Sequence, residues 1–579
     1  MLGSSLHADY NPFNGAAVAP NIAEVRLGSQ GISVQLEIYI GDISVFEALI
    51  PDDWVSESSA DRPNATERLE DFGLNGLSIR RDDGSALAVK LQRIEPRMRI
   101  NRAPPWAGQR DPITGQILPQ PPEDKRVIFA ELFYDFEGSR PESVTIVPPQ
   151  NKDRTPSAII GLLVFDRSVP VIKFSFLSNA ARLAIDWSDP WYSLFDNPNL
   201  RRHHQSALTT YLYLEPREVR HETLIRVRDL AAWIDLGVND ATTLSVENQD
   251  RIKSLALGFL KDRNPVTING KAVKPASGRA SFLTISDVGL QIVENEGPLD
   301  PLSTFVGVIL SFPVPELPQN AAVDWDMFND RIVMVPATLT DPAGPFLSGA
   351  TPDSPNIEWT NFLRTHQDPQ VRPVQTPGHG QIYVPTISLG LIAAALLSAF
   401  LAFARLGSSR VVALLVLLAG AGSAVMTRHA AIVELNNPLV GAPDPDSTAR
   451  IFSALLENIN SANLETDPAI ELKLLETVLS EGSKSTIMAE LDRALSVRIA
   501  GGGLARVDTI SDVSMSEIST LPDRAGFQSL AEWTAIASAG HWGHDHRRNL
   551  RYRALVEVAR EQGAWKLAGI TVIETSDLR

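Results

Sequence analysis

The stretch ISVQLEIYIGD at residues 32–42 alternates apolar and polar side chains, a pattern typical of a β-strand with one buried face. A similar stretch, VRHETLIRVRD at residues 219–229, begins 187 residues later. Each passes into a short apolar segment, at residues 43–49 and 230–236. The N-terminal part of the chain is therefore expected to contain two copies of one strand-rich unit.

Four further landmarks recur in the same order. They are an amphipathic helix (68–72 and 251–255), a Gly-containing turn (83–84 and 269–270), a strand (129–136 and 305–312) and an Ile-x-Trp triplet (185–187 and 357–359). The pattern predicts two tandem β-rich, sandwich-like modules, at residues 24–190 and 215–362, joined by a linker at 191–214. A proline-rich insertion at residues 102–122 is expected to form an extended loop.

The composition excludes several classes of site. The chain has 579 residues and a net charge of −17, from 52 Lys and Arg against 69 Asp and Glu, and it has no cysteine. A chain without cysteine has no disulfides, thiolate metal ligands or cysteine nucleophiles. Because Lys and Arg do not cluster, the acidic balance also argues against nucleic acid as a partner.

Two apolar runs predict a membrane anchor. Residues 384–404 carry no charge, and a second run at 411–426 can extend to residue 433. We expect a stalk at 363–382, transmembrane helices at 383–404 and 411–433, and a short cytoplasmic loop at 405–410, with the lipid bilayer as a partner. Arg405 and Arg410 in the loop favour this orientation. Both large regions would then lie on the periplasmic or outer side of a bacterial inner (cytoplasmic) membrane, and residues 1–23 would be a leader remnant or a disordered segment.

The pattern after the second apolar run changes from strands to helices. Helices are expected near 448–459, 468–479 and 485–497, followed by strands near 505–510, 531–538, 550–559 and 565–574. This order resembles the SnoaL-like and nuclear-transport-factor-like superfamily, whose helices cover the concave side of a curled sheet. The resemblance implies an α+β cone-like domain at residues 440–579. Since cone folds of this kind host enzymes, it leaves open a pocket acid or base at His544 or His546 with Asp545.

One local motif stands out in this region. The segment GHWGHDHRRN at residues 540–549, with Trp565 further on, resembles a His-Trp-Gly-His signature of uncharacterised bacterial envelope proteins. His541, His544 and His546 are candidate ligands for a transition metal. The alternative is a tight structural corner, for which the candidate residues are Gly540, Trp542, Gly543, Arg547, Asn549 and Trp565. His203 and His204 lie in a basic loop that is either a second metal-binding segment or a solvated linker.

The sequence carries none of the phosphate-binding, zinc-protease or nucleophile-elbow motifs that would indicate a reaction. The expected function is therefore that of a membrane-anchored envelope protein, a non-catalytic accessory subunit that binds protein partners in an envelope complex and holds no cofactor. One alternative is a periplasmic transition-metal-handling protein that uses the histidine cluster. The other is an enzyme with a site in the cone pocket.

Overall fold

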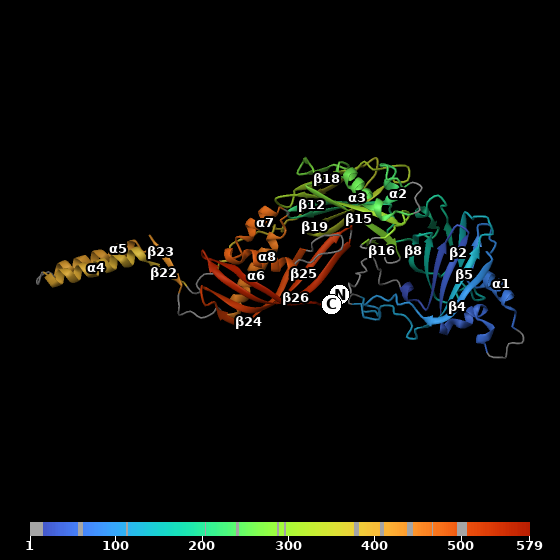
Figure 1. Cartoon of the computed structure of the whole chain (residues 1–579), viewed down its shortest axis with the longest axis horizontal. Helices are drawn as coiled ribbons and strands as arrows, with labels where there is room; N and C mark the ends of the chain where they lie inside the picture. Colours follow the sequence, from blue (N-terminus) through green and yellow to red (C-terminus); the bar gives the residue numbers. More distant parts are fainter. Residues whose placement is uncertain are drawn as a thin grey trace. The chain divides into compact units, whose positions relative to one another are not determined.

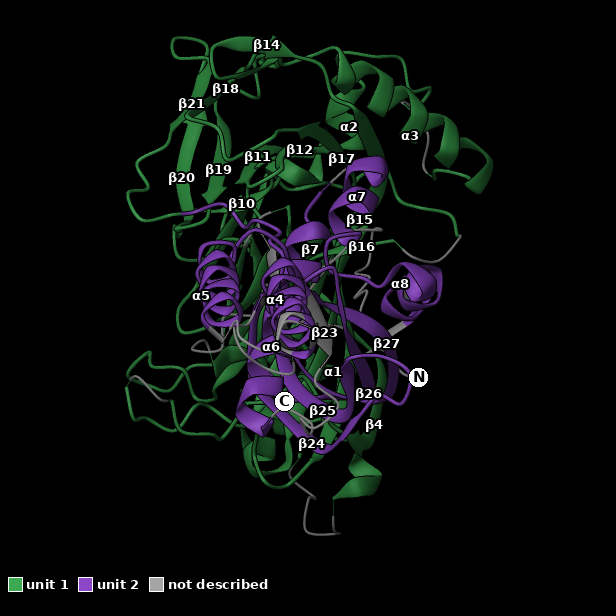
Figure 2. Ribbon diagram, turned by 90° about the vertical axis from the view of Figure 1, so that its left-hand side faces the viewer, with its two compact units in different colours: residues 1–366, 540–546 green, residues 367–539, 547–579 purple. Residues whose placement is uncertain are grey.

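The computed structural model describes residues 15–55, 62–111, 114–202, 204–238, 243–286, 289–293, 297–375, 381–405, 410–436, 444–465, 467–494, 506–542 and 544–578. The side chains of residues 544–547 lie outside the described part. The chain forms two compact units (Figure 2). Unit 1 comprises residues 1–366 and 540–546, and unit 2 comprises residues 367–539 and 547–579.

Unit 1 begins with a β-rich module, called module 1, that contains two sheets (Figure 1). The larger sheet has six strands in the order β4-β5-β2-β1-β7-β8, and the smaller has four in the order β10-β9-β6-β3. The elements are η1 (Gly15–Val18), β1 (Asn21–Leu27), β2 (Gly31–Tyr39), η2 (Ile40–Leu49), η3 (Asp52–Trp54), α1 (Ala65–Asn75), β3 (Ser78–Arg81), β4 (Val89–Met98), β5 (Arg126–Asp135), β6 (Ser143–Val147), β7 (Ile160–Asp166), β8 (Val169–Phe176), β9 (Ala181–Ala184), η4 (Pro190–Tyr192) and β10 (Leu194–Phe195).

Module 2 follows in the same unit. Its larger sheet has the order β16-β15-β17-β12-β11-β19-β20, and its smaller sheet the order β14-β13-β18-β21. The elements are β11 (Leu208–Glu215), β12 (Glu218–Arg226), α2 (Val227–Leu230), α3 (Val246–Lys261), β13 (Val266–Ile268), β14 (Lys271–Val273), β15 (Ser277–Ser286), β16 (Gly289–Ile292), β17 (Thr304–Pro313), β18 (Asn320–Asp324), β19 (Val335–Asp341), β20 (Gly344–Ala350) and β21 (Asn356–Thr360).

The large sheets of the two modules share one strand order. The series β4-β5-β2-β1-β7-β8 corresponds strand by strand to β15-β17-β12-β11-β19-β20. In each series one neighbouring pair is parallel, β1 with β7 and β11 with β19. The hairpins β1-β2 and β11-β12 close at Gly28 with Gly31 and at Glu215 with Glu218, so both have two-residue turns.

Each module is a sandwich because its two sheets share an apolar core. In module 1, Val34 and Leu36 of the large sheet join Ile79 and Ile146 of the small sheet in one buried cluster. The alternation at residues 32–38 explains this, since every second side chain of β2 points into the core. The strands predicted from the alternation at 32–42 and 219–229 are confirmed as β2 and β12.

The predicted transmembrane hairpin is wrong. Among the described residues, no helix combines the length and apolar character needed to cross a membrane. The ends of the apolar runs form strands instead, β22 (Gln381–Pro385) paired with β23 (Ile432–Asn436). Between them lie α4 (Thr386–Arg405) and α5 (Arg410–Met426). With 17 residues, α5 measures about 26 Å, against the roughly 30 Å of a hydrocarbon core.

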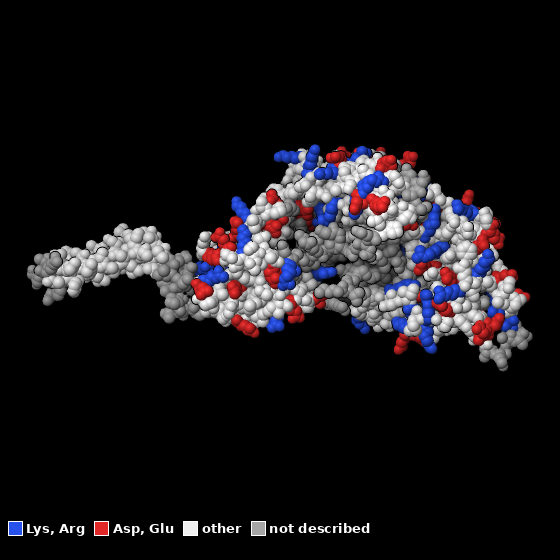
Figure 3. Space-filling model, in the orientation of Figure 1, with Lys and Arg blue, Asp and Glu red and all other residues white. Residues whose placement is uncertain are grey.

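The helices α4 and α5 pack closely through small side chains. A Cβ built on Gly420 would lie 2.3 Å from the Cβ of Ala395, so the helices meet at a glycine. Their described outward residues are mostly apolar and none is charged, and both helices are white in Figure 3.

Unit 2 also contains three α-helices and a sheet of four long strands in chain order. The elements are α6 (Pro445–Ala462), α7 (Pro468–Leu475), η5 (Glu481–Ser483), α8 (Lys484–Ala494), β24 (Arg506–Thr520), β25 (Gly526–His541), β26 (His544–Glu561) and β27 (Ala564–Asp577). The Phe452 ring of α6 lies 5.4 Å from Trp533 of β25, which stacks on Tyr552 of β26. One apolar core therefore joins the first helix to the sheet.

Candidate functional site

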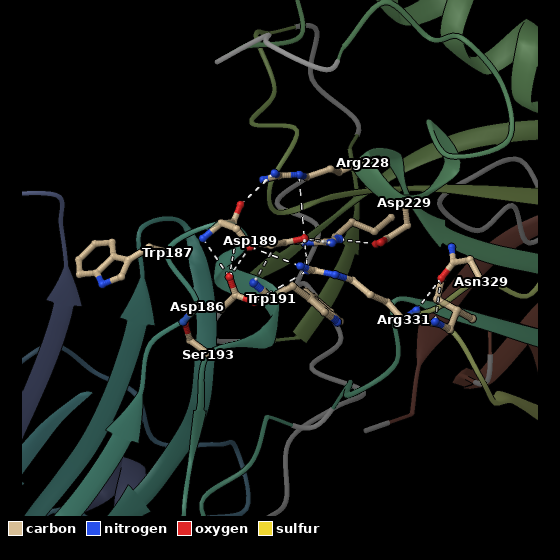
Figure 4. Close-up of polar contacts among 12 residues, drawn as sticks. Asp186, Trp187, Asp189, Trp191, Ser193, Arg228, Asp229, Asn329 and Arg331 are labelled. Atoms are coloured by element: carbon tan, nitrogen blue, oxygen red, sulfur yellow. Dashed lines mark hydrogen bonds and ion pairs between the residues drawn. The ribbon is translucent and has the colours of Figure 1, made fainter. Parts of the chain in front are cut away.

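A buried ionic cluster joins module 1 to module 2 (Figure 4). Arg226, whose side chain is fully buried, donates two hydrogen bonds to Asp189, of 2.7 Å to Oδ1 and 2.5 Å to Oδ2. Its Nε donates to Oδ2 of Asp229 at 2.6 Å. Because Asp189 caps η4 of module 1 and Arg226 ends β12 of module 2, this bidentate pair joins the two modules.

Further residues hold the Asp189 segment in place. Asp189 Oδ1 accepts the backbone N–H of Trp191, and Arg228 donates to the carbonyl of Ser188 at 2.9 Å. Arg331 lies 3.9 Å from both Asp186 and Asp189. Although burial alone would raise it, the pKa of Asp189 is lowered by the hydrogen bonds and charge of Arg226. Asp189 therefore stays ionised in the folded chain.

The second candidate site is on the large sheet of module 2. It holds the turn between β25 and β26, whose residues belong to unit 1 although the strands beyond them belong to unit 2. Trp542 in this turn is only 2% exposed and packs in the core of module 2. Its backbone has φ +45°, which is uncommon for a residue other than glycine. A bulky residue held in this conformation indicates that its surroundings impose the position.

Two charged residues of β12 hold the backbone of the turn. Glu222 Oε2 accepts the N–H of Trp542 at 2.6 Å, and Arg220 donates to the carbonyl of Gly540. Arg220 Nε also donates to Glu222 Oε1 at 2.7 Å. Burial raises the pKa of Glu222, while the charge of Arg220 and the hydrogen bonds from Trp542 and Arg220 oppose this shift. We call Arg220, Glu222 and Gly307 the turn receptor.

Gly307 on β17 makes room for the indole ring. A Cβ at this position would lie 2.6 Å from two ring carbons of Trp542 and 2.9 Å from Leu283. We expect Gly307→Ala to displace Trp542 and to cost about 1–3 kcal/mol of stability. Hydrogen exchange of a peptide covering residues 538–550 measures this, since displacement exposes the Trp542 amide. Gly258→Ala is the control because a Cβ there meets open space, and equal protection in both variants would contradict the expectation.

His221 lies between the two receptor residues on β12 but on the opposite face. It is 2% exposed, its Nε2 lies 2.8 Å from Thr210 Oγ1, and burial lowers its pKa to about 4. The unfolded chain has a histidine pKa of about 6.5 and thus binds a proton that the folded chain does not. Stability should therefore fall, by on the order of 1–3 kcal/mol, as the pH drops from about 6.5 to 4.

His221→Asn should remove this part of the pH dependence. The raised pKa of Glu222 has the opposite sign, because the folded chain then binds the proton more tightly and loses stability as the pH rises. Urea midpoints at pH 7 and pH 4.5 for wild type, His221→Asn and the exposed His429→Asn separate the two effects. An unchanged pH dependence in His221→Asn would show that His221 is not the group responsible.

The predicted site residues of the C-terminal motif are spread over different environments. His541 is 7% exposed, with its ring 4.9 Å from that of Trp542. Gly543 and the side chains of His544, His546 and Arg547 lie outside the described residues. Asn549 is exposed on β26, and its carbonyl accepts a hydrogen bond from the backbone N–H of Leu578. Trp565 packs near Phe527 in the core of unit 2, whereas Trp542 packs in the core of module 2.

The other histidine pair is also divided. His203 lies outside the described residues, and the ring of His204 lies 5.3 Å from that of Phe305 and 6.4 Å from that of Trp191. Within the described part of the chain, no group of three His, Asp or Glu side chains is placed to hold a metal ion.

Sequence reasoning missed Arg220, Glu222, Gly307 and Arg226. The alternation at 219–229 gives no sign that the turn covers two polar positions of β12. One available signal was Gly307 itself, an isolated glycine in the apolar strand TFVGVILSF, which is typical of a close approach by another group. No protein-family model matches the chain, and no curated protein matches it either.

Proposed function

We propose that this protein is a non-catalytic assembly protein whose second module is a receptor for a tryptophan-bearing β-turn. The observation that carries the proposal is the binding of Trp542. Its side chain is almost fully buried, and its backbone N–H donates to the fully buried carboxylate of Glu222. Buried aromatic anchors fixed by a few polar contacts are typical of interaction sites. In the chain itself, the receptor is filled by the chain's own turn.

The rigid joint between the modules supports the same proposal. Arg226 is matched by two carboxylates, so its charge is used in holding the modules together. Because the two modules are held together, the receptor lies on a pre-organised sheet. Less conformational entropy is then lost when a partner binds. The proposed partner is a protein with a turn of the same kind. The expected membrane-side location depended on the transmembrane hairpin and is not part of this proposal.

The test is binding of the turn in trans. A fluorescent cyclic peptide with residues 538–546 should bind the full-length Trp542→Ala chain, whose receptor is vacated, and should bind wild type at least tenfold more weakly. The same peptide with Ala in place of Trp542 is the matched control. Adding Glu222→Gln to the Trp542→Ala chain should weaken peptide binding about tenfold, which corresponds to about 1.4 kcal/mol of binding free energy. Equal binding by the peptide that lacks the indole would contradict the proposal.

A further inference from the structure

Module 1 contains a cavity of about 330 Å³ that the proposed function does not use. Three segments line it: η1, residues 98–103 at and after the end of β4, and residues 121–125 before β5. Residues 98–103 and 121–125 lie at the two ends of the proline-rich insertion. Pockets for small ligands are about 300–1,000 Å³, so this cavity suits a small molecule.

Three basic residues line the cavity, namely Arg99, Arg102 and Lys125. The buried carboxylate near them is Glu37, which is 2% exposed. Glu37 accepts from Arg102 at 2.7 Å and from Arg97 at 2.7 Å, so its single charge is shared between two guanidinium groups. The cluster therefore keeps an excess of positive charge. Figure 3 shows several basic side chains over the region where Figure 1 draws β4.

Arg99 is the most deeply placed of the three. It is 9% exposed, and its Nη2 donates to the carbonyl of Ala19 at 2.8 Å. Its Nη1 is buried and has no hydrogen-bond partner among the residues that the structure describes. Burial lowers the pKa of Arg99, and the nearby charge of Arg102 lowers it further, against the effect of Glu37. A buried guanidinium with a spare donor is stabilised by a further anion.

The ionic cluster at Arg226 in module 2 is a useful contrast. There, two carboxylates, Asp189 and Asp229, surround one guanidinium group. In module 1, one carboxylate, Glu37, accepts from two guanidinium groups, so the positive charges outnumber the negative one.

We propose that module 1 binds a small organic anion, with its carboxylate or phosphate group at Arg99, Arg102 and Lys125 and its apolar body against Met98 and Ile100. Both apolar residues line the cavity yet are well exposed, Met98 by 62% and Ile100 by 50%. Large apolar side chains left open beside a basic pocket are suited to the apolar part of such a ligand.

The test uses the full chain and isothermal titration calorimetry with hexanoate, hexanamide and inorganic phosphate. Hexanoate should bind at least tenfold more tightly than the neutral amide and than phosphate, and its affinity should fall with added salt. Lys125→Gln, at an exposed position, should weaken hexanoate binding about fivefold to tenfold. Lys152→Gln, an exposed lysine of the same module away from the cavity, should leave it unchanged.

A second variant tests the apolar part of the site. Ile100→Ser should weaken hexanoate binding several-fold and leave the weaker binding of phosphate unchanged. The proposal is overturned if hexanoate does not bind at millimolar concentration, if hexanamide or phosphate binds equally well, or if Lys125→Gln and Lys152→Gln behave alike.

Discussion

Arg226→Gln is expected to lower the free energy of unfolding of unit 1 by about 3–5 kcal/mol. The substitution leaves Asp189, which is 5% exposed, and Asp229 without the cation that both contact. The loss is costly because the cations that remain near Asp189, namely Arg228 and Arg331, lie 3.9 Å away and do not replace a bidentate pair. Urea denaturation of the full chain, followed by hydrogen exchange of peptides from β11 and β12, measures the loss in this unit.

Two variants control this prediction. Arg228→Gln removes a cation that is 42% exposed and 3.9 Å from Asp189, so it should cost less than about 1 kcal/mol. Replacing Asp189 and Asp229 by Asn together with Arg226→Met removes all three charges, and should restore part of the stability that Arg226→Gln loses. If Arg226→Gln and Arg228→Gln proved equally mild, the ionic cluster would not be what fixes the modules.

The sequence was informative where a pattern is local. The alternation at 32–42 and 219–229 predicted β2 and β12, because a period of two residues is a local property of a strand. Hydropathy was misleading at the apolar runs. It could not show that Val384 and Val433 belong to two paired strands, since pairing depends on residues about 50 positions apart.

The candidate sites depend on contacts that no local pattern contains. Glu37, Arg220 and Glu222 occupy polar positions of alternating strands, and the alternation does not show what covers them. Each is covered by a segment that is distant in the sequence. Residues 97–102 cover Glu37, and the turn at 540–542 covers Arg220 and Glu222. The motif around Trp542 marked one half of the receptor contact. The other half is 320 residues away and carried no motif.

Trp542→Ala is expected to destabilise the contact between the turn and module 2 by about 3–5 kcal/mol, as for other large-to-small changes in a core. The indole is 2% exposed and lies against Gly307, which has no side chain to fill the space left behind. Hydrogen exchange of residues 538–550 and of β12 should rise together. Trp542→Phe, which keeps an aromatic ring, should lose less than half as much protection.

Trp542→Gly separates the ring from the backbone in this prediction. Both Ala and Gly lack the indole, but only Gly adopts φ +45° without strain. Trp542→Gly should therefore be milder than Trp542→Ala by about 1 kcal/mol, in spite of the greater flexibility of glycine in the unfolded chain. If both variants kept wild-type protection at residues 538–550, the ring would not anchor the turn. If only Trp542→Ala lost it, the anchor would be the turn's backbone geometry, held by Glu222 and Arg220, and not the indole.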